Sequence, residues 1–422
     1  MAITSRKVCT QALAGNACAT FRIGFGMSTK KHARALATTC VGFVAVASCS
    51  GSLRAQTTPV DFSGWTDKAY QAPLSDGVQL YGRFINSIDY VTGGGNPPSE
   101  RMANYGSAWG FRGTETLTSD LKAVFQVESA FSTNDGTGTF GARETFVGLS
   151  SKTYGTLRMG RFQAPYDRHG IFGDALAETQ GLGITTVLWS NCGIAMKGTA
   201  GYTKAQGCFD IKYPDSIRYD SPNFGPFFGA VQYYAYNQDI NNQGLGGAHV
   251  WSGSINYVSG RLQAAIGYEG DYGVLGPGQD NYAAEITAGY QVTRNIYFGG
   301  IVQQLNYEVD AQKHNIRQNM LGLVARYTPG PWGFEFNYGI AGSGYGSAPV
   351  GSAVGSVRKG PGTGAQHFVL TARYNFSKRT ALYGQLVEVK NAANGIYSIK
   401  PAGARQPGES EHGVSLGIIH YF

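Results

Sequence analysis

From residue 78 to the C-terminus, the chain consists of segments of about ten residues in which apolar and polar side chains alternate. In the segment 366–376, for example, Phe368 and Leu370 share one face, while Thr371 and Arg373 share the other. A period of two residues is typical of a β-strand with one apolar and one polar face. No segment after the first 55 residues offers the 18 consecutive apolar residues of a helical membrane span.

Sixteen such segments follow one another, and the connectors between them alternate between short turns and longer loops rich in Gly, Asn and Ser. Strands of about ten residues, with short turns at one end and long loops at the other, are typical of outer-membrane barrels. We therefore predict an all-β fold, a 16-stranded antiparallel transmembrane β-barrel. The expected strands are 78–90, 105–115, 119–132, 139–151, 154–162, 213–221, 227–237, 248–258, 261–271, 281–291, 295–307, 315–328, 331–342, 365–376, 379–391 and 411–422.

A soluble β-sandwich with one wet face would show the same alternation and is the alternative to the barrel. Aromatic residues make up 13% of the chain and charged residues only 14%, which suits the aromatic girdles of a membrane barrel. In a bilayer, only closure of the sheet satisfies every backbone polar group. The regularity of the pattern over the whole chain favours the barrel.

The first 55 residues have the composition of an export signal. They contain seven basic residues and no acidic one, and the basic cluster 30–34 precedes an apolar stretch at 35–47. That stretch has the length of a secretory h-region and is too short to span a bilayer. We expect 1–55 to be a signal peptide, 56–77 an N-terminal extension and 78–422 the barrel.

The leader allows more than one processing scheme. Cleavage after Ala55 or after Ala47 fits a small-residue site, and Met27 is an alternative start just before the basic cluster. Cys49 lies in a stretch that loosely resembles a lipoprotein box, which would attach a lipid there instead.

Removing the leader removes the net charge. The full chain has 34 bases and 27 acids, and the leader holds seven of the bases and none of the acids, which leaves 27 against 27. A neutral mature chain lacks the basic surplus of a nucleic-acid-binding protein, so we expect no nucleic-acid partner.

Four of the six cysteines lie in the leader, and the mature chain keeps Cys192 and Cys208. In an exported protein such a pair predicts a disulfide closing a short loop, with two free thiols as the alternative. The chain has no CxxC motif and no Cys/His spacing typical of zinc sites. No phosphate-cradling Gly-rich motif follows a strand, so we expect no metal and no cofactor.

Several of these segments together resemble the general porins of Gram-negative bacteria, especially the betaproteobacterial type. The resemblance covers nearly all of 78–422, and each motif by itself is weak. The matching motifs are Gly77–Arg83, Trp109–Glu115, Leu121–Glu128, Arg143–Leu149, Gly155–Arg161, Asp215–Phe224 and Gly417–Phe422.

The resemblance implies a homotrimer in the outer membrane, in contact with lipid and lipopolysaccharide, through which small hydrophilic solutes diffuse passively. The terminal Phe422 resembles the assembly signal that the barrel assembly machinery recognises. The family folds its third long loop into the barrel, and the connector 163–212 holds that position here, with Asp174 and Glu178 and with the cysteine pair bracing it. Ala108 departs from the family, which commonly has an arginine facing the lumen at this position.

Strand parity assigns charges to the lumen if the apolar faces contact lipid. The bases assigned in this way are Arg83, Arg112, Lys122, Arg143, Arg158, Arg218, Arg261, Arg326 and Arg373, and the acids are Asp89, Glu128, Asp220, Glu269, Glu285 and Glu335. Charge rings set selectivity in pores, so nine bases against six acids predict a modest preference for anions.

The family match singles out four of these bases for the constriction. We expect Arg83, Arg112, Arg143 and Arg218 to line it, opposite the loop acids Asp174 and Glu178. The alternative for each arginine is a solvated or locally paired residue of the lumen.

Two other classes of function compete with the channel. Gly413–Gly417 matches the G-x-S-x-G pattern of a hydrolase nucleophile, but that motif needs a strand, a sharp turn and a helix, whereas this chain ends five residues later within a strand. The loops 343–364 and 392–410 suit a surface adhesin or a substrate-specific channel, although such loops are more often only variable. We therefore expect a channel and not an enzyme.

Overall fold

The structure is a computed structural model. It describes residues 76–166, 181–183, 196–197, 203–204, 209, 211–235, 247–274, 276–399 and 406–422. Every regular element within these ranges is a β-strand, and none of them contains a helix long and apolar enough to cross a membrane. All of these strands lie within the compact unit that ends at Phe422.

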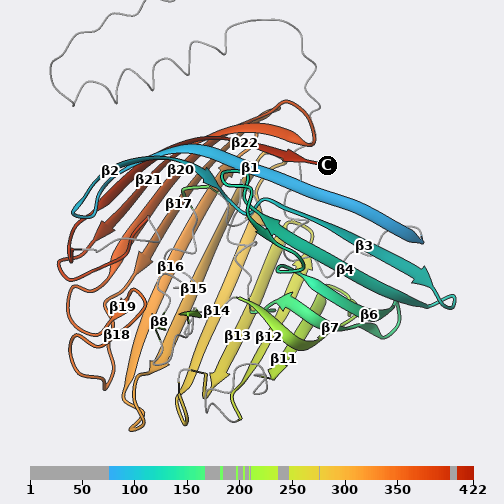
Figure 1. Cartoon of the computed structure of the whole chain (residues 1–422), viewed down its shortest axis with the longest axis horizontal. Helices are drawn as coiled ribbons and strands as arrows, with labels where there is room; N and C mark the ends of the chain where they lie inside the picture. Colours follow the sequence, from blue (N-terminus) through green and yellow to red (C-terminus); the bar gives the residue numbers. More distant parts are fainter. Residues whose placement is uncertain are drawn as a thin grey trace, which may run out of the picture. The chain divides into compact units, whose positions relative to one another are not determined.

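One antiparallel sheet of 18 elements forms the barrel wall (Figure 1). Its elements are β1 (Gly77–Gly93), β2 (Asn96–Asn104), β3 (Ala108–Thr116), β4 (Leu121–Phe131), β5 (Gly138–Thr139), β6 (Thr145–Ser151), β7 (Gly155–Gln163), β10 (Lys212–Asp220), β11 (Phe227–Ala235), β12 (His249–Ser259), β13 (Leu262–Tyr272), β14 (Asp280–Gln291), β15 (Ile296–Glu308), β16 (Asn315–Tyr327), β17 (Trp332–Ala341), β20 (Ala365–Asn375), β21 (Thr380–Asn391) and β22 (Glu411–Tyr421). Two two-stranded sheets lie outside the wall: β8 (Met196–Lys197) with β9 (Thr203–Lys204), and β18 (Ala353–Val354) with β19 (Val357–Arg358).

These elements make sixteen crossings, because β2 with β3 and β5 with β6 each form one strand of the wall. β1 pairs with β3 and β2 on one side and with the last strand, β22, on the other. The β1–β22 ladder runs from Arg83↔Tyr421 to Gly93↔Glu411 and closes the sheet. The predicted 16-stranded antiparallel barrel is confirmed.

The outer face of the wall is apolar and its inner face is polar. Along β1, the outward side chains of Val78 and Ile88 are 67% and 68% exposed, whereas the inward side chains of Arg83 and Asp89 are 2% and 0% exposed. A soluble protein shows the reverse arrangement. An outward apolar band around a polar interior is the arrangement of a barrel that faces lipid.

The second crossing starts earlier than the sequence pattern predicts. The expected strand is 105–115, whereas the structure adds β2 before it and joins β1 to β2 by a tight turn at Gly94 and Gly95, both with positive φ. Pro97 and Pro98 conceal this strand in the sequence, because proline cannot donate to a sheet ladder. They are tolerated because β2 pairs with β1 alone among the described strands.

Candidate functional site: the charged lumen wall

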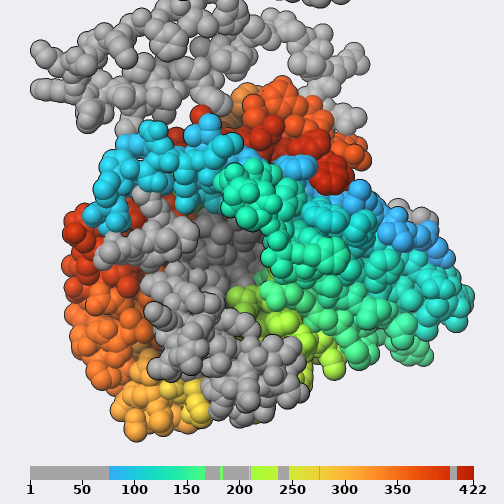
Figure 2. Space-filling view, in the orientation of Figure 1, coloured from blue at the N-terminus to red at the C-terminus, as the bar shows by residue number. Residues whose placement is uncertain are grey.

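The inward faces of β1–β7 and β10, together with the segment just before β6, form a wall rich in basic residues, which we call the base-rich wall. Figure 2 shows the molecule hollowed beside the blue-to-green residues of β1–β7. Two networks and one buried carboxylate organise the charges of this wall. Among the described residues, its members are the bases Arg83, Arg101, Arg112, Lys122, Arg143, Arg158, Arg161, Lys212 and Arg218 and the acids Asp89, Glu128, Glu144 and Asp220.

Glu128 on β4 is the centre of the first network. Its carboxylate accepts a hydrogen bond from the Tyr81 hydroxyl at 3.2 Å and forms an ion pair with the Arg143 guanidinium. Arg83 and Lys212 also lie within electrostatic reach of this carboxylate. Three cations around one acid leave this part of the wall with a positive surplus.

Arg83 and Arg112 are held by neutral partners near this network. The Arg83 Nε donates to the Gly106 carbonyl at 2.9 Å, at the break between β2 and β3. The Arg112 Nε donates to Gln79 Oε1 at 2.9 Å, and its guanidinium lies 5.1 Å from the centre of the Tyr81 ring. A backbone carbonyl and a side-chain amide oxygen thus fix the orientation of these two guanidinium groups.

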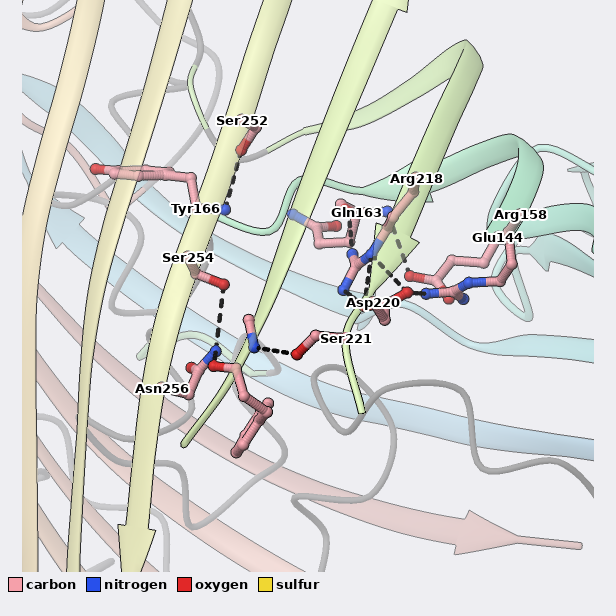
Figure 3. Close-up of polar contacts among 12 residues, drawn as sticks. Glu144, Arg158, Gln163, Tyr166, Arg218, Asp220, Ser221, Ser252, Ser254 and Asn256 are labelled. Atoms are coloured by element: carbon pink, nitrogen blue, oxygen red, sulfur yellow. Dashed lines mark hydrogen bonds and ion pairs between the residues drawn. The ribbon is translucent and has the colours of Figure 1, made fainter. Parts of the chain in front are cut away.

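Asp220 on β10 is the centre of the second network (Figure 3). It accepts a bond from Arg158 of β7 at 2.5 Å and from Arg218 of its own strand at 2.8 Å. Arg218 also donates to the Gln163 carbonyl at 2.8 Å, where β7 ends. The Arg158 guanidinium also lies 4.8 Å from the centre of the Phe146 ring, so this arginine is held by packing as well as by charge.

Asp89 on β1 is fully buried and joins the first and last strands of the barrel. Its carboxylate accepts bonds from the hydroxyls of Ser87 and Ser415, both at 2.7 Å, and of Tyr105, at 2.5 Å. Arg101 of β2 lies 3.4 Å from it. Since Ser415 is on β22, this group reinforces the seam at which the barrel closes.

The inward faces of β12–β17 and β20–β22 form an acid-rich wall, in which acids outnumber bases. Tyr213 of β10 donates its hydroxyl to Glu269 at 2.6 Å, and Gln303 contacts Glu285 at 3.5 Å. Glu335 pairs with Arg326 at 2.8 Å. Among the described residues, the members of this wall are the acids Glu269, Asp271, Glu285, Glu335 and Glu411 and the bases Arg326 and Arg373.

The described parts of the connector 163–212 contact the inside of the barrel. The Tyr166 amide donates to Ser252 Oγ at 3.0 Å, and its hydroxyl bonds the Gln303 amide. Farther along the connector, the Gly183 amide donates to Gln385 Oε1 at 3.1 Å. Ser252, Gln303 and Gln385 all lie on the acid-rich half of the wall, on β12, β15 and β21, so this connector folds inward.

A second loop, 392–410, also packs inward in its described part. The Tyr397 hydroxyl donates to Gln318 Oε1 at 2.6 Å, and the Ile399 amide donates to Glu411 at 2.6 Å. Burial raises the pKa of Tyr397, so its hydroxyl stays protonated and remains a donor. The sequence suggested a partner-binding or variable surface segment here, and the inward packing of the described part differs from that expectation.

The structure brings Arg83 and Arg143 together around Glu128, and it places Arg112 beside Tyr81 and Arg218 beside Asp220. The loop acids Asp174 and Glu178 and the pair Cys192 and Cys208 lie outside the described residues. Parity also assigned Arg261 to the lumen. The structure instead places it in the exposed turn before β13, where it donates to the Val292 carbonyl at 2.9 Å.

Ala108 is buried directly across from Arg83 in the β1–β3 ladder. Ser415 of the G-x-S-x-G match lies in the middle of β22 and is fully buried against Asp89. It has no strand–turn–helix around it, so the geometry of a nucleophile elbow is missing.

The parity assignment left out Arg101, Arg161, Lys212, Glu144, Asp271 and Glu411. Arg101 and Lys212 lie outside the expected strands 105–115 and 213–221, whereas Asp271 and Glu411 continue the regular alternation of Glu269 and Ser415 at the ends of their strands. Around Arg161 the alternation itself breaks. Gly160 has φ +141°, and the β7–β10 ladder shifts register between Tyr213 and Ser216. A bulge changes the face to which the following residues point, so strict alternation fails there. A glycine inside a strand pattern was the signal that could have located this bulge.

A closed 16-stranded barrel with an apolar exterior, charged inner walls and inward-folded loops defines an outer-membrane channel. The sequence model of the Gram-negative porin family matches residues 37–394. The chain belongs to the Gram-negative porins.

Relatives support this assignment over most of the chain. The outer membrane porin protein 32 of Delftia acidovorans is 29% identical over 83% of this chain and 95% of its own length. The structure of the anion-selective porin from Comamonas acidovorans superposes with a TM-score of 0.67 at 26% identity, covering 82% of this chain and all of that one. OmpT of Vibrio cholerae, at 13% identity, shares the fold with a TM-score of 0.58 over 82% of this chain and all of that one. The first two of these proteins are named porins, and porins are channels rather than enzymes.

Proposed function

We propose that this outer-membrane porin passes small hydrophilic solutes by passive diffusion, with a weak preference for anions. The base-rich wall is the observation that carries the preference: nine bases face the lumen there with four acids among the described residues. Charge lining a pore raises the local concentration of the opposite ion and sets selectivity. The similar porin from Comamonas acidovorans is described as anion-selective.

We further propose that Arg83, Arg112, Arg143 and Arg218 line the constriction. The inward course of the connector 163–212 would bring Asp174 and Glu178 to the lumen. Acids across a narrow passage from a cationic wall create a transverse field, which orients dipolar solutes and disfavours apolar ones. The contacts of Tyr166 and Gly183 with the opposite half of the wall support this arrangement.

A homotrimer is the proposed assembly, in contact with outer-membrane lipid and lipopolysaccharide. The OmpT structure, which has the same fold, is of a trimer form. For Phe422 we propose a role as the signal for the assembly machinery, since its amide and carbonyl bond Gly82 at 3.0 and 3.2 Å in the finished barrel. We also propose a disulfide between Cys192 and Cys208, a signal peptide at 1–55 and an N-terminal extension at 56–77. N-terminal sequencing and a thiol assay of the exported protein test them.

The deciding experiment is single-channel conductance in a planar bilayer, with the reversal potential measured under a salt gradient. Ohmic steps in groups of three are expected for a trimeric diffusion pore. If the sign of the reversal potential shows that anions pass more readily than cations, the base-rich wall is supported as the element that sets selectivity. Clear cation preference overturns the proposed selectivity, and a folded trimer without conductance overturns the open channel.

A further inference from the structure

Four aromatic rings form a continuous patch on the outward face of β17 and β20, close to the short-turn end of the barrel. The centre of the Trp332 ring lies 4.8 Å from that of Tyr374 and 5.9 Å from that of Phe334. Tyr374 lies 5.1 Å from Phe376, where the chain leaves β20. Aromatic side chains at a membrane boundary lie at the depth of the lipid head groups.

The turn that follows this patch is basic. Lys378 and Arg379 directly follow Phe376 and Ser377, and both side chains are exposed. Hydrogen bonds from the Arg379 and Thr380 amides to the Ser377 hydroxyl, both at 3.1 Å, fix the backbone of the turn. Neither basic side chain makes an ion pair with any residue that the structure describes.

No side-chain carboxylate competes for these cations in the neighbouring strands. The sequence has no acidic residue between Glu335 and Glu388. Glu335 points inward and pairs with Arg326, while Glu388 lies toward the opposite, long-loop end of β21 and beside His412. On β22, His420 adds a third basic side chain at this end, with its Nδ1 2.9 Å from Thr380 Oγ1.

The short turns next to β3, β4 and β6, at the same end of the barrel, carry acidic as well as basic residues. Asp120 there accepts bonds from the Ser151 hydroxyl and the Lys152 amide, and Asp76 accepts one from Thr116. Acidic residues therefore accompany the basic ones on that side. The Lys378–Arg379 turn thus differs from those short turns, since it carries two side-chain cations beside the aromatic patch and no side-chain acid. The C-terminal carboxylate of Phe422 also lies at this end, because the Tyr421 amide donates to the Arg379 carbonyl at 2.8 Å.

We propose that the aromatic patch and the Lys378–Arg379 turn form a binding site for an anionic phospholipid of the inner leaflet. Short turns lie on the periplasmic side of such barrels, which places this turn at the inner-leaflet head groups. The head-group phosphate meets the two side-chain cations, and the rings pack along the glycerol and upper acyl region. A zwitterionic lipid offers the same apolar contact but carries no net negative charge to match the cations.

Native mass spectrometry of the detergent-purified protein tests this site, with phosphatidylglycerol and phosphatidylcholine offered in equal amounts. The wild type is expected to retain phosphatidylglycerol preferentially. The double variant K378Q/R379Q should lower that preference roughly tenfold, since each basic residue near a membrane surface adds attraction for anionic lipid. Both positions lie in an exposed turn, and heat-modifiability on a gel verifies that the variant barrel is folded.

The matched control is K313Q/K390Q, which removes two exposed cations at the long-loop end and should leave the preference unchanged. Equal retention of the two lipids by the wild type overturns the proposal, and so does an equal loss in both variants. A third arm offers a carboxylate-bearing muropeptide. If K378Q/R379Q loses muropeptide binding but keeps its preference for phosphatidylglycerol, the turn binds the cell wall and the lipid assignment is wrong.

Discussion

The two halves of the lumen wall hold their charges in different ways. On the base-rich half, Asp220 is shared between Arg158 and Arg218, and Glu128 lies within electrostatic reach of three bases. On the acid-rich half, Glu269 accepts a bond from the Tyr213 hydroxyl and Glu411 from the Ile399 amide, while Glu335 pairs with Arg326. The first arrangement leaves a surplus of positive charge facing the lumen, while the second fixes loops and neighbouring strands.

This difference separates two tasks within one barrel. The base-rich half supplies the electric field, because its nine bases outnumber its four acids among the described residues, and contacts such as that of Arg112 with Gln79 hold the side chains in place. The acid-rich half supplies the anchors of the inward loops, at Gln303, Gln385 and Gln318. Substitutions on the first half should change selectivity most, whereas those on the second should change loop position together with a smaller change in selectivity.

The largest expected effect comes from breaking the Asp220 network. Asp220→Ala leaves two arginines, 3% and 6% exposed, without their shared carboxylate. Loss of one partner from a buried ion pair costs about 3–5 kcal/mol, so the folded barrel should melt at a clearly lower temperature. Circular dichroism and gel heat-modifiability measure the melting temperature. The control is Asp280→Ala, which removes a carboxylate from a partly exposed ion pair. An unchanged melting temperature would show that the network does not stabilise the wall.

A smaller effect should follow from lowering the surplus charge of the base-rich wall. A unit charge about 10 Å from a permeating ion in water contributes about 0.4 kcal/mol, or a factor of about two in ion preference. The double variant R143Q/R161Q should therefore shift the reversal potential toward cation flow. The control R294Q/R317Q removes two exposed cations that lie off this wall. Identical shifts in the two variants would refute the idea that the wall sets selectivity.

The opposite substitution on the acid-rich wall sharpens the comparison. Glu285→Gln removes a negative charge from an inward residue that is 2% exposed, and Gln keeps nearly the same shape. The reversal potential should move toward anion flow, by less than in the double arginine variant because only one charge changes. Bilayer recordings under the same salt gradient measure the shift. A movement toward cation flow would contradict the assignment of Glu285 to the lumen.

The smallest effect concerns a hydrogen-bonded pair outside both walls, in the loop after β15. The His314 Nδ1 lies 2.7 Å from the Asp310 carboxylate, and this hydrogen bond lowers the pKa of Asp310 below its usual 3.8. Because the folded pKa is depressed, the contribution of the pair is present above pH 3.8 and is lost as the pH falls through the lowered value. His314→Ala should return the pKa of Asp310 toward 3.8, as carboxyl NMR titration would reveal. With His412→Ala as the control, an unchanged titration would show that the histidine is not the cause.

Much of the fold could be predicted because a strand alternates with a period of two. That period alone placed Arg158, Arg218 and Asp220 on the inner face, where they lie in the structure. It failed where the backbone departs from regular alternation, at the Gly160 bulge and at the prolines of β2. Bulges and prolines interrupt the pattern without ending the strand, so the sequence underestimates both.

The sequence by itself determined the number of strands, the apolar exterior and the side on which most charges lie, because these depend on spacing within each segment. Only the tertiary structure decided which charges meet. Asp89 bonds Ser415 across 326 residues because closure places the first strand beside the last. Tyr213 bonds Glu269, and Tyr397 bonds Gln318, because the curved wall brings strands from distant parts of the chain to one interior. Pairing across a closed barrel depends on register and curvature, which no single segment encodes.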